Sequence, residues 1–107
     1  MDIKNDINAL QWKVSEVSAT LRLLANEKRL LVLCRLALAG EMSVGALAEA
    51  IGLSQSALSQ HLARLRADGL VANRREAQVL YYRISDPRVR SLLEALYKIY
   101  CEPESDV

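Results

Sequence analysis

Residues 53–65 read Leu-Ser-Gln-Ser-Ala-Leu-Ser-Gln-His-Leu-Ala-Arg-Leu, and this stretch decides the fold of the chain. Leu58, Leu62 and Leu65 are spaced by four and three residues, which places them on one face of a helix. Ser54 is a good N-cap for that helix, and Gly69 suits the left-handed position just past its end. We therefore predict a helix from about residue 54 to 68 with one buried face.

The opposite face of this helix is polar and carries few charges in its first two turns. Serine and glutamine side chains can hydrogen-bond base edges, and arginine can also contact phosphates. A helix that is merely solvated would more often carry Glu and Lys there, although an ordinary exposed face is the alternative. For His61, a DNA contact and helix packing both stay open. The residues that we expect to contact DNA are Ser54, Gln55, Ser56, Ser59, Gln60, His61 and Arg64.

The segment before this helix forms a second short helix. Residues 43–52 read Ser-Val-Gly-Ala-Leu-Ala-Glu-Ala-Ile-Gly, with Ser43 as a suitable cap and Gly52 in a tight turn. A helix, a short glycine-containing turn and a second helix make up a helix-turn-helix, in which the second helix enters the major groove. We assign residues 43–68 to this unit.

Two segments rich in β-branched and aromatic residues follow, over residues 70–75 and 79–84. They predict a β-hairpin, or wing, over 70–84, with a polar bend over 74–78. Arg74 and Arg75 of this bend suit phosphate contact or insertion into a minor groove, although solubilising charges are the alternative. The whole chain has a net charge of +1, yet residues 54–83 hold five arginines against two acidic residues. Acidic residues gather instead in the C-terminal tail, at Glu102, Glu104 and Asp106.

Helices are expected on both sides of this unit. Apolar residues recur at intervals of three and four over 6–24, an apolar core helix is expected over 26–39, and Pro87 begins a final apolar helix over 86–101. The first and last helices carry more apolar surface than one small domain covers. We expect a two-fold homodimer with two reading helices about one DNA turn apart. Intramolecular packing of both helices is the alternative.

The chain has 107 residues, of which 51% are hydrophobic, and this is enough for one core. We expect a single winged helix-turn-helix domain over residues 1–107, with no additional enzyme domain. No apolar run reaches bilayer length, and residues 1–6 lack the order of a secretory signal. We therefore expect a cytoplasmic protein without a membrane partner.

The order of elements and several local motifs resemble the ArsR (SmtB/ArsR) family of winged-helix bacterial repressors. The resemblance is carried by residues 43–48 and 53–62, by Ala-Asn-Glu-Lys-Arg-Leu at 25–30 and by Asp-Gly-Leu-Val at 68–71. It implies a mainly α fold with four helices, a small β-hairpin and a final helix. It also implies a homodimeric repressor that binds an inverted repeat of double-stranded operator DNA and is released by an inducer.

The chain departs from the family's metal sensors. Those sensors carry a Cys-x-Cys motif where this chain has Val44-Gly45-Ala46, or Asp, His and Glu ligands on the final helix, which here has no His. A metal needs three or four convergent ligands, so we expect neither a metal nor another cofactor. The alternatives are a metal or other inducer, a winged-helix module for protein contact and, least favoured, a small thiol enzyme.

The chain has two cysteines, Cys34 and Cys101. A free cysteine in a cytosolic protein is usually a small buried hydrophobe, and for either residue taken alone this is the favoured interpretation. As a pair, their placement resembles the dithiol subgroup of the ArsR family typified by the BigR, SqrR and HlyU regulators. That resemblance implies redox or persulfide sensing through a disulfide or polysulfide between the two positions. Arg35 and Lys98 lie nearby in sequence and could favour the thiolate.

Overall fold

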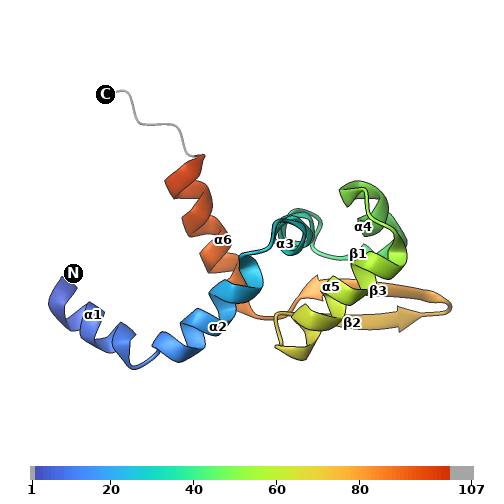
Figure 1. Ribbon diagram of the computed structural model, residues 1–107. Helices are drawn as coiled ribbons and strands as arrows, with labels where there is room; N and C mark the ends of the chain where they lie inside the picture. Colours follow the sequence, from blue (N-terminus) through green and yellow to red (C-terminus); the bar gives the residue numbers. More distant parts are fainter. Residues whose placement is uncertain (1, 102–107) are drawn as a thin grey trace.

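The computed structural model describes residues 2–101. Their order is helix, helix, helix, strand, helix, helix, strand, strand, helix (Figure 1). The predicted fold class, mainly α with a winged helix-turn-helix, is confirmed. The elements are α1 (Ile3–Gln11), α2 (Val14–Leu24), α3 (Glu27–Ala39), β1 (Met42–Ser43), α4 (Val44–Ile51), α5 (Gln55–Ala67), β2 (Val71–Glu76), β3 (Val79–Ile84) and α6 (Pro87–Tyr100).

Side-chain caps fix where the helices around the reading unit begin. Asn26 accepts a hydrogen bond from the Arg29 amide at 3.1 Å, and Ser43 accepts one from the Ala46 amide at 3.1 Å. Each cap satisfies one of the amides that a first helical turn leaves without a partner. Gly52, with φ of +78°, ends α4 in the left-handed conformation, which allows the short turn into α5. The helix-turn-helix predicted over residues 43–68 is present.

The core lies where α3, α4 and α5 meet the sheet. Leu58, Leu62 and Leu65 of α5 are fully buried, as their spacing predicts. α3 contributes three buried residues, Val32, Leu33 and Leu36. Its outer face is open, with Leu38 83% exposed, so α3 is less completely enclosed than its apolar sequence suggests.

The sheet has three strands in the order β1-β3-β2, all antiparallel. The wing differs in two ways from its sequence prediction. β2 continues through Glu76, so the bend is the short segment Ala77–Gln78 instead of residues 74–78, and Arg74 and Arg75 lie within the strand. In addition, the two-residue strand β1 extends the hairpin by pairing Met42 with Tyr82.

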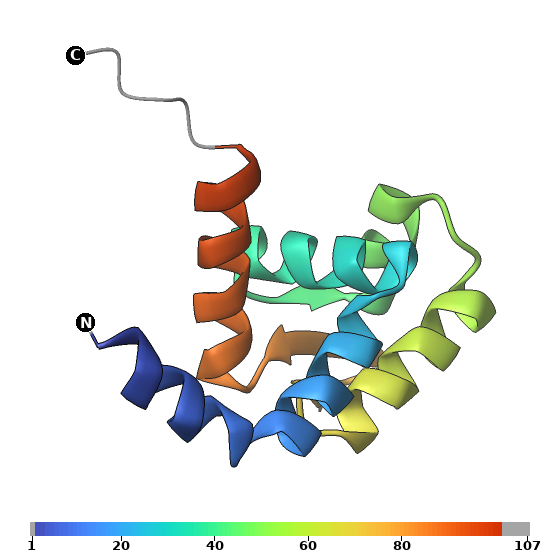
Figure 2. The same cartoon turned by 60° about the vertical axis from the view of Figure 1, so that its left-hand side comes forward.

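The N-terminal segment differs from the single helix expected over residues 6–24. It forms two helices, α1 and α2, which are separated at Trp12 and Lys13 and extend as an arm from one side of the molecule (Figure 2). This arm leaves a large apolar surface uncovered, with Trp12 89% exposed. The C-terminal half of α6 also exposes large apolar side chains, namely Tyr97, Ile99 and Tyr100. None of the helices between residues 2 and 101 is both long and apolar enough to cross a membrane.

Candidate nucleic-acid interface

The outer face of α5 presents the polar residues that the sequence singled out. Ser54, Gln55, Ser56, Ser59, Gln60 and Arg64 are all exposed. The Ser54 hydroxyl accepts a hydrogen bond from the Ala57 amide at 3.1 Å, so it caps α5 and places the first helical turn. The other five side chains form a continuous hydrogen-bonding face on a helix whose opposite side is locked into the core. A rigid helix with such a face can lie in a major groove of DNA and recognise base edges there.

His61 lies at the margin of this face. It is half-buried and follows the fully buried Leu58 by three residues, which places it beside the core stripe of α5. Its side chain is therefore partly accessible to solvent. Both roles considered from the sequence, a DNA contact and helix packing, are compatible with this position.

Arg74 and Arg75 lie on opposite faces of the wing, because successive residues of a strand alternate. Arg75 shares its face with Val71, which is buried against the core, and it pairs with Leu80 across the hairpin. Arg75 itself is exposed, and no carboxylate of residues 2–101 forms an ion pair with it. Its charge is available on the face that carries the reading helix α5.

Arg74 is engaged on the outer face of the sheet. Its Nε and Nη2 donate to both carboxylate oxygens of Glu41, at 2.8–3.2 Å, and its Nη1 donates to Glu76 at 3.0 Å. The guanidinium also stacks over the Tyr81 ring, 4.5 Å from its centroid. These hydrogen bonds lower the pKa of the Glu41 carboxyl and raise the pKa of Arg74. Sequence reasoning missed Glu41 and Tyr81, and nothing local in the sequence links either of them to Arg74.

The two thiols lie on α3 and at the end of α6. Both are free and exposed, so the expectation of a buried structural cysteine is wrong for each of them. A groove of about 350 Å³ lies between these helices, and Arg90 of α6 donates to the Ala37 carbonyl of α3 at 3.5 Å across it. Cys34 precedes Ala37 by three residues, and Cys101 follows Tyr97, another lining residue, by four. Each cysteine therefore lies about one helical turn from a lining residue, and neither is itself part of the groove lining.

Metal ligands do not gather anywhere in the described part of the chain. Between residues 2 and 101, no group of three or more His, Cys, Asp and Glu side chains is arranged to hold an ion. A metal site of ordinary coordination would need such a group.

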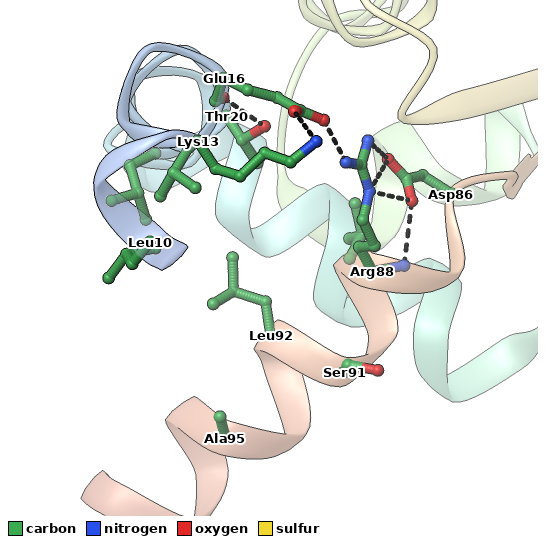
Figure 3. A pocket seen from close by; sticks show the side chains of 12 residues that line it. Leu10, Lys13, Glu16, Thr20, Asp86, Arg88, Ser91, Leu92 and Ala95 are labelled. Carbon is green, nitrogen blue, oxygen red and sulfur yellow. Dashed lines mark hydrogen bonds and ion pairs between the residues drawn. The ribbon is translucent and has the colours of Figure 1, made fainter. Parts of the chain in front are cut away.

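A second hollow, of about 580 Å³, lies between the N-terminal arm and α6 (Figure 3). Leu10, Leu92 and Ala95 form part of its apolar lining. At its rim, Arg88 of α6 forms ion pairs with Glu16 of α2 and with Asp86. The hydrogen bonds from Arg88 lower the pKa of both carboxyls. The hollow thus continues the uncovered apolar surface of α1 and α6.

Comparison with known proteins gives one consistent assignment. Residues 26–73 match the family described as bacterial regulatory protein, arsR family. The chain is 52% identical to the transcriptional activator HlyU of Vibrio cholerae over 91% of its own length and 89% of that protein. It resembles the structure of reduced HlyU from Vibrio cholerae, with a TM-score of 0.80 and 45% identity over 88% of this chain and 98% of that one. It also resembles the structure of the transcriptional repressor BigR from Xylella fastidiosa, with a TM-score of 0.83 and 36% identity over 90% and 97% of the two chains.

Proposed function

This chain belongs to the ArsR family of bacterial regulatory proteins and is a DNA-binding transcriptional regulator, and we propose that it is a homodimeric repressor whose release is controlled by its two thiols. In this proposal, the dimer binds an inverted-repeat operator. It leaves the operator when Cys34 and Cys101 are linked by a disulfide or polysulfide. The inducer is a reactive sulfur species or an oxidant.

The division of α5 into two faces carries the DNA-binding part of the proposal. Leu58, Leu62 and Leu65 hold the helix on the core, while Gln55, Ser56, Ser59, Gln60 and Arg64 remain exposed. With α5 in the major groove, glutamine side chains can pair with adenine edges, and serine side chains can contact bases or phosphates. Ser54 sets the position of the helix, and Arg75 of the wing supplies a phosphate contact that fixes its register.

The uncovered apolar surfaces of α1 and α6 support the homodimer. Ile3, Ile7 and Leu10 on α1, together with Ile99 and Tyr100 on α6, are all at least 45% exposed. An isolated soluble domain rarely leaves extended apolar surface in water, so exposed large apolar side chains on two helices favour a protein partner. A two-fold dimer through this surface presents two reading helices to the half-sites of an inverted repeat, which lie about 34–36 Å apart.

The exposure of both thiols, on α3 and at the end of α6, carries the sensing part of the proposal. A cysteine thiolate attacks the outer sulfur of a persulfide, RSSH, which gives a cysteine persulfide and releases RS⁻. The thiolate of the second cysteine then attacks the inner sulfur of that persulfide, which forms the disulfide and expels HS⁻. If both cysteines become persulfidated, attack of one terminal sulfur on the inner sulfur of the other gives a trisulfide and HS⁻. One similar structure is described as reduced HlyU, and redox sensitivity of this chain is part of our proposal.

A bridge weakens DNA binding only if it favours a conformation that binds the operator less well. Cys34 lies on the helix that packs on α4 and α5, and Cys101 lies at the end of the helix that we assign to the dimer surface. A link between them therefore couples the core of each protomer to the dimer surface, which sets the distance between the two reading helices.

Mass spectrometry of the protein after treatment with a persulfide donor, peroxide or an organic disulfide tests the sensing chemistry. We expect an intramolecular link between Cys34 and Cys101 that reductant removes, with added sulfur mass only after the persulfide donor. The matched controls are Cys34→Ser and Cys101→Ser, which retain a single thiol. Modification of single thiols without any link in the wild type would contradict the sensing proposal and leave DNA binding intact.

A further inference from the structure

The outer face of the wing holds a cluster of charged and aromatic side chains that has no direct part in the recognition of bases. We define the Arg74 clamp as Arg74 of β2, Tyr81 of β3 and Glu41, which immediately precedes β1, together with Glu76 of β2. From this arrangement we propose that Arg74 is a positioning residue, which holds the wing at a fixed angle to the reading helix and does not itself contact phosphate. The inference rests on operator binding by α5 and the wing.

The register of the sheet shows how the clamp spans all three strands. Arg74 pairs with Tyr81, so their side chains stand on the same face of the hairpin. Met42 pairs with Tyr82, and Glu41, one residue earlier, therefore comes opposite Arg83 on that face. The Arg74 side chain thus crosses from β2 over the Tyr81 ring to the start of β1.

The hydrogen bonds of the Arg74 clamp fix how the Arg74 guanidinium is oriented. The three donor–acceptor distances from Arg74 to Glu41 and the one from Arg74 to Glu76 lie between 2.8 and 3.2 Å. Such a fork between a guanidinium and a carboxylate fixes orientation as well as distance. The Arg74 side chain is 45% exposed and that of Glu41 31%, so the clamp positions the wing without contributing much to the overall stability.

The clamp ties the wing to the body of the domain through the end of α3. Glu41 follows the C-cap Gly40 of α3, a helix whose residues Val32, Leu33 and Leu36 are fully buried. The far end of the hairpin, by contrast, has few buried side chains, since Arg75, Glu76, Ala77 and Gln78 are all exposed. Without the clamp, the outer part of the wing can bend relative to α5.

The charge balance distinguishes Arg74 from Arg75. Two carboxylates already compensate Arg74, so a phosphate would have to displace them, whereas Arg75 on the opposite face has no such partner among residues 2–101. Release of counterions from DNA makes the affinity depend on salt, with a slope of about 0.9 for each phosphate contact. Of these two arginines, only Arg75 is expected to contribute to this slope.

The test measures the affinity of reduced protein for its operator duplex over a range of salt concentrations, by fluorescence anisotropy. The variants are Arg74→Gln, Glu41→Gln and the double variant, with Arg75→Gln as the matched control. We expect Arg74→Gln and Glu41→Gln each to weaken binding about threefold, the double variant to weaken it no further, and the salt slope to stay at the wild-type value. Arg75→Gln is expected to reduce the slope by about 0.9 for each wing.

Glu41→Gln gives the sharpest outcome, because removal of a negative charge near DNA would by itself strengthen binding. Tighter binding by Glu41→Gln would show that the clamp is not needed to position the wing, and a lower salt slope for Arg74→Gln would show that Arg74 contacts phosphate. Either result would overturn the proposal. Unchanged affinity in both single variants would also overturn it. Hydrogen exchange of the amides in residues 71–84 gives a second readout, which we expect to be faster in both single variants. A wild-type protein that does not bind DNA would instead refute the proposed function.

Discussion

Replacement of Leu62 by Ala should lower the stability of the domain without changing which base pairs α5 prefers. Leu62 is fully buried, so truncation removes apolar contacts and leaves a cavity, at a cost of about 2–5 kcal/mol. A domain of this size is stable by only about 5–15 kcal/mol. A loss of about 3 kcal/mol lowers the melting temperature of such a domain by roughly 15 °C. We therefore expect a folded but strongly destabilised protein.

Gln60→Ala is the matched control on the opposite face of the same helix. Gln60 is exposed, so its truncation should change the free energy of unfolding by less than about 0.5 kcal/mol. Its loss should instead relax the preference for one base pair in each half-site, by about 1–3 kcal/mol.

The assays are thermal unfolding at one fixed protein concentration and competition between operators altered at single positions. Competition is measured at a temperature where the Leu62→Ala protein is folded. We expect Leu62→Ala to lose stability and keep the wild-type order of base preferences, and Gln60→Ala to do the reverse. Equal losses of stability in both variants, or wild-type preferences at every position in Gln60→Ala, would refute the two-faced description of α5.

Three further predictions concern other parts of the chain. Ile99→Asp places a charge on the exposed apolar face of α6 and should shift the protein from dimer toward monomer in analytical ultracentrifugation. An unchanged dimer would show that the interface lies elsewhere. Asn26→Ala removes the cap of α3 and should cost about 1 kcal/mol in chemical denaturation, and a loss of only a few tenths would show that the cap is dispensable. Arg88 holds the pKa of Glu16 and of Asp86 below the ordinary value, so these carboxyls stabilise the fold at neutral pH, and this contribution declines as the pH falls through their lowered pKa values. Arg88→Gln should therefore make unfolding less dependent on pH between about pH 5 and pH 3 than in the wild type, and an identical pH profile would contradict this.

The elements that local signals specify could be predicted from the sequence. The period of Leu58, Leu62 and Leu65 predicts both α5 and its buried face, and the caps at Asn26 and Ser43 fix two helix starts. Each of these features depends on residues within a few positions of one another.

The features that the sequence did not reveal depend on other causes. Leu10 and Val14 keep the apolar spacing across the break between α1 and α2, so periodicity alone does not detect it. β1 has only two residues and owes its conformation to pairing with β3, far along the chain. The ion pair between Arg74 and Glu41 spans 33 positions and has no local signature.

The exposed polar face of α5 was predicted, and the structure adds the division between Arg74 and Arg75 on opposite faces of the wing. The sequence favoured burial for each thiol taken alone, because free cysteines are more often buried, and the structure shows both exposed. Cys34 lies on the open side of α3, next to positions that face the core, and only the packing of that helix decides which side is buried.

The affinity for operator DNA before and after treatment with a persulfide donor tests the central claim most directly. The wild type, Cys34→Ser and Cys101→Ser are compared at one salt concentration, and each is measured again after reduction. We predict that treatment weakens binding by the wild type alone and that reduction restores it. Unchanged affinity in the treated wild type, or the same loss in either serine variant, would contradict the control of DNA release by a Cys34–Cys101 bridge.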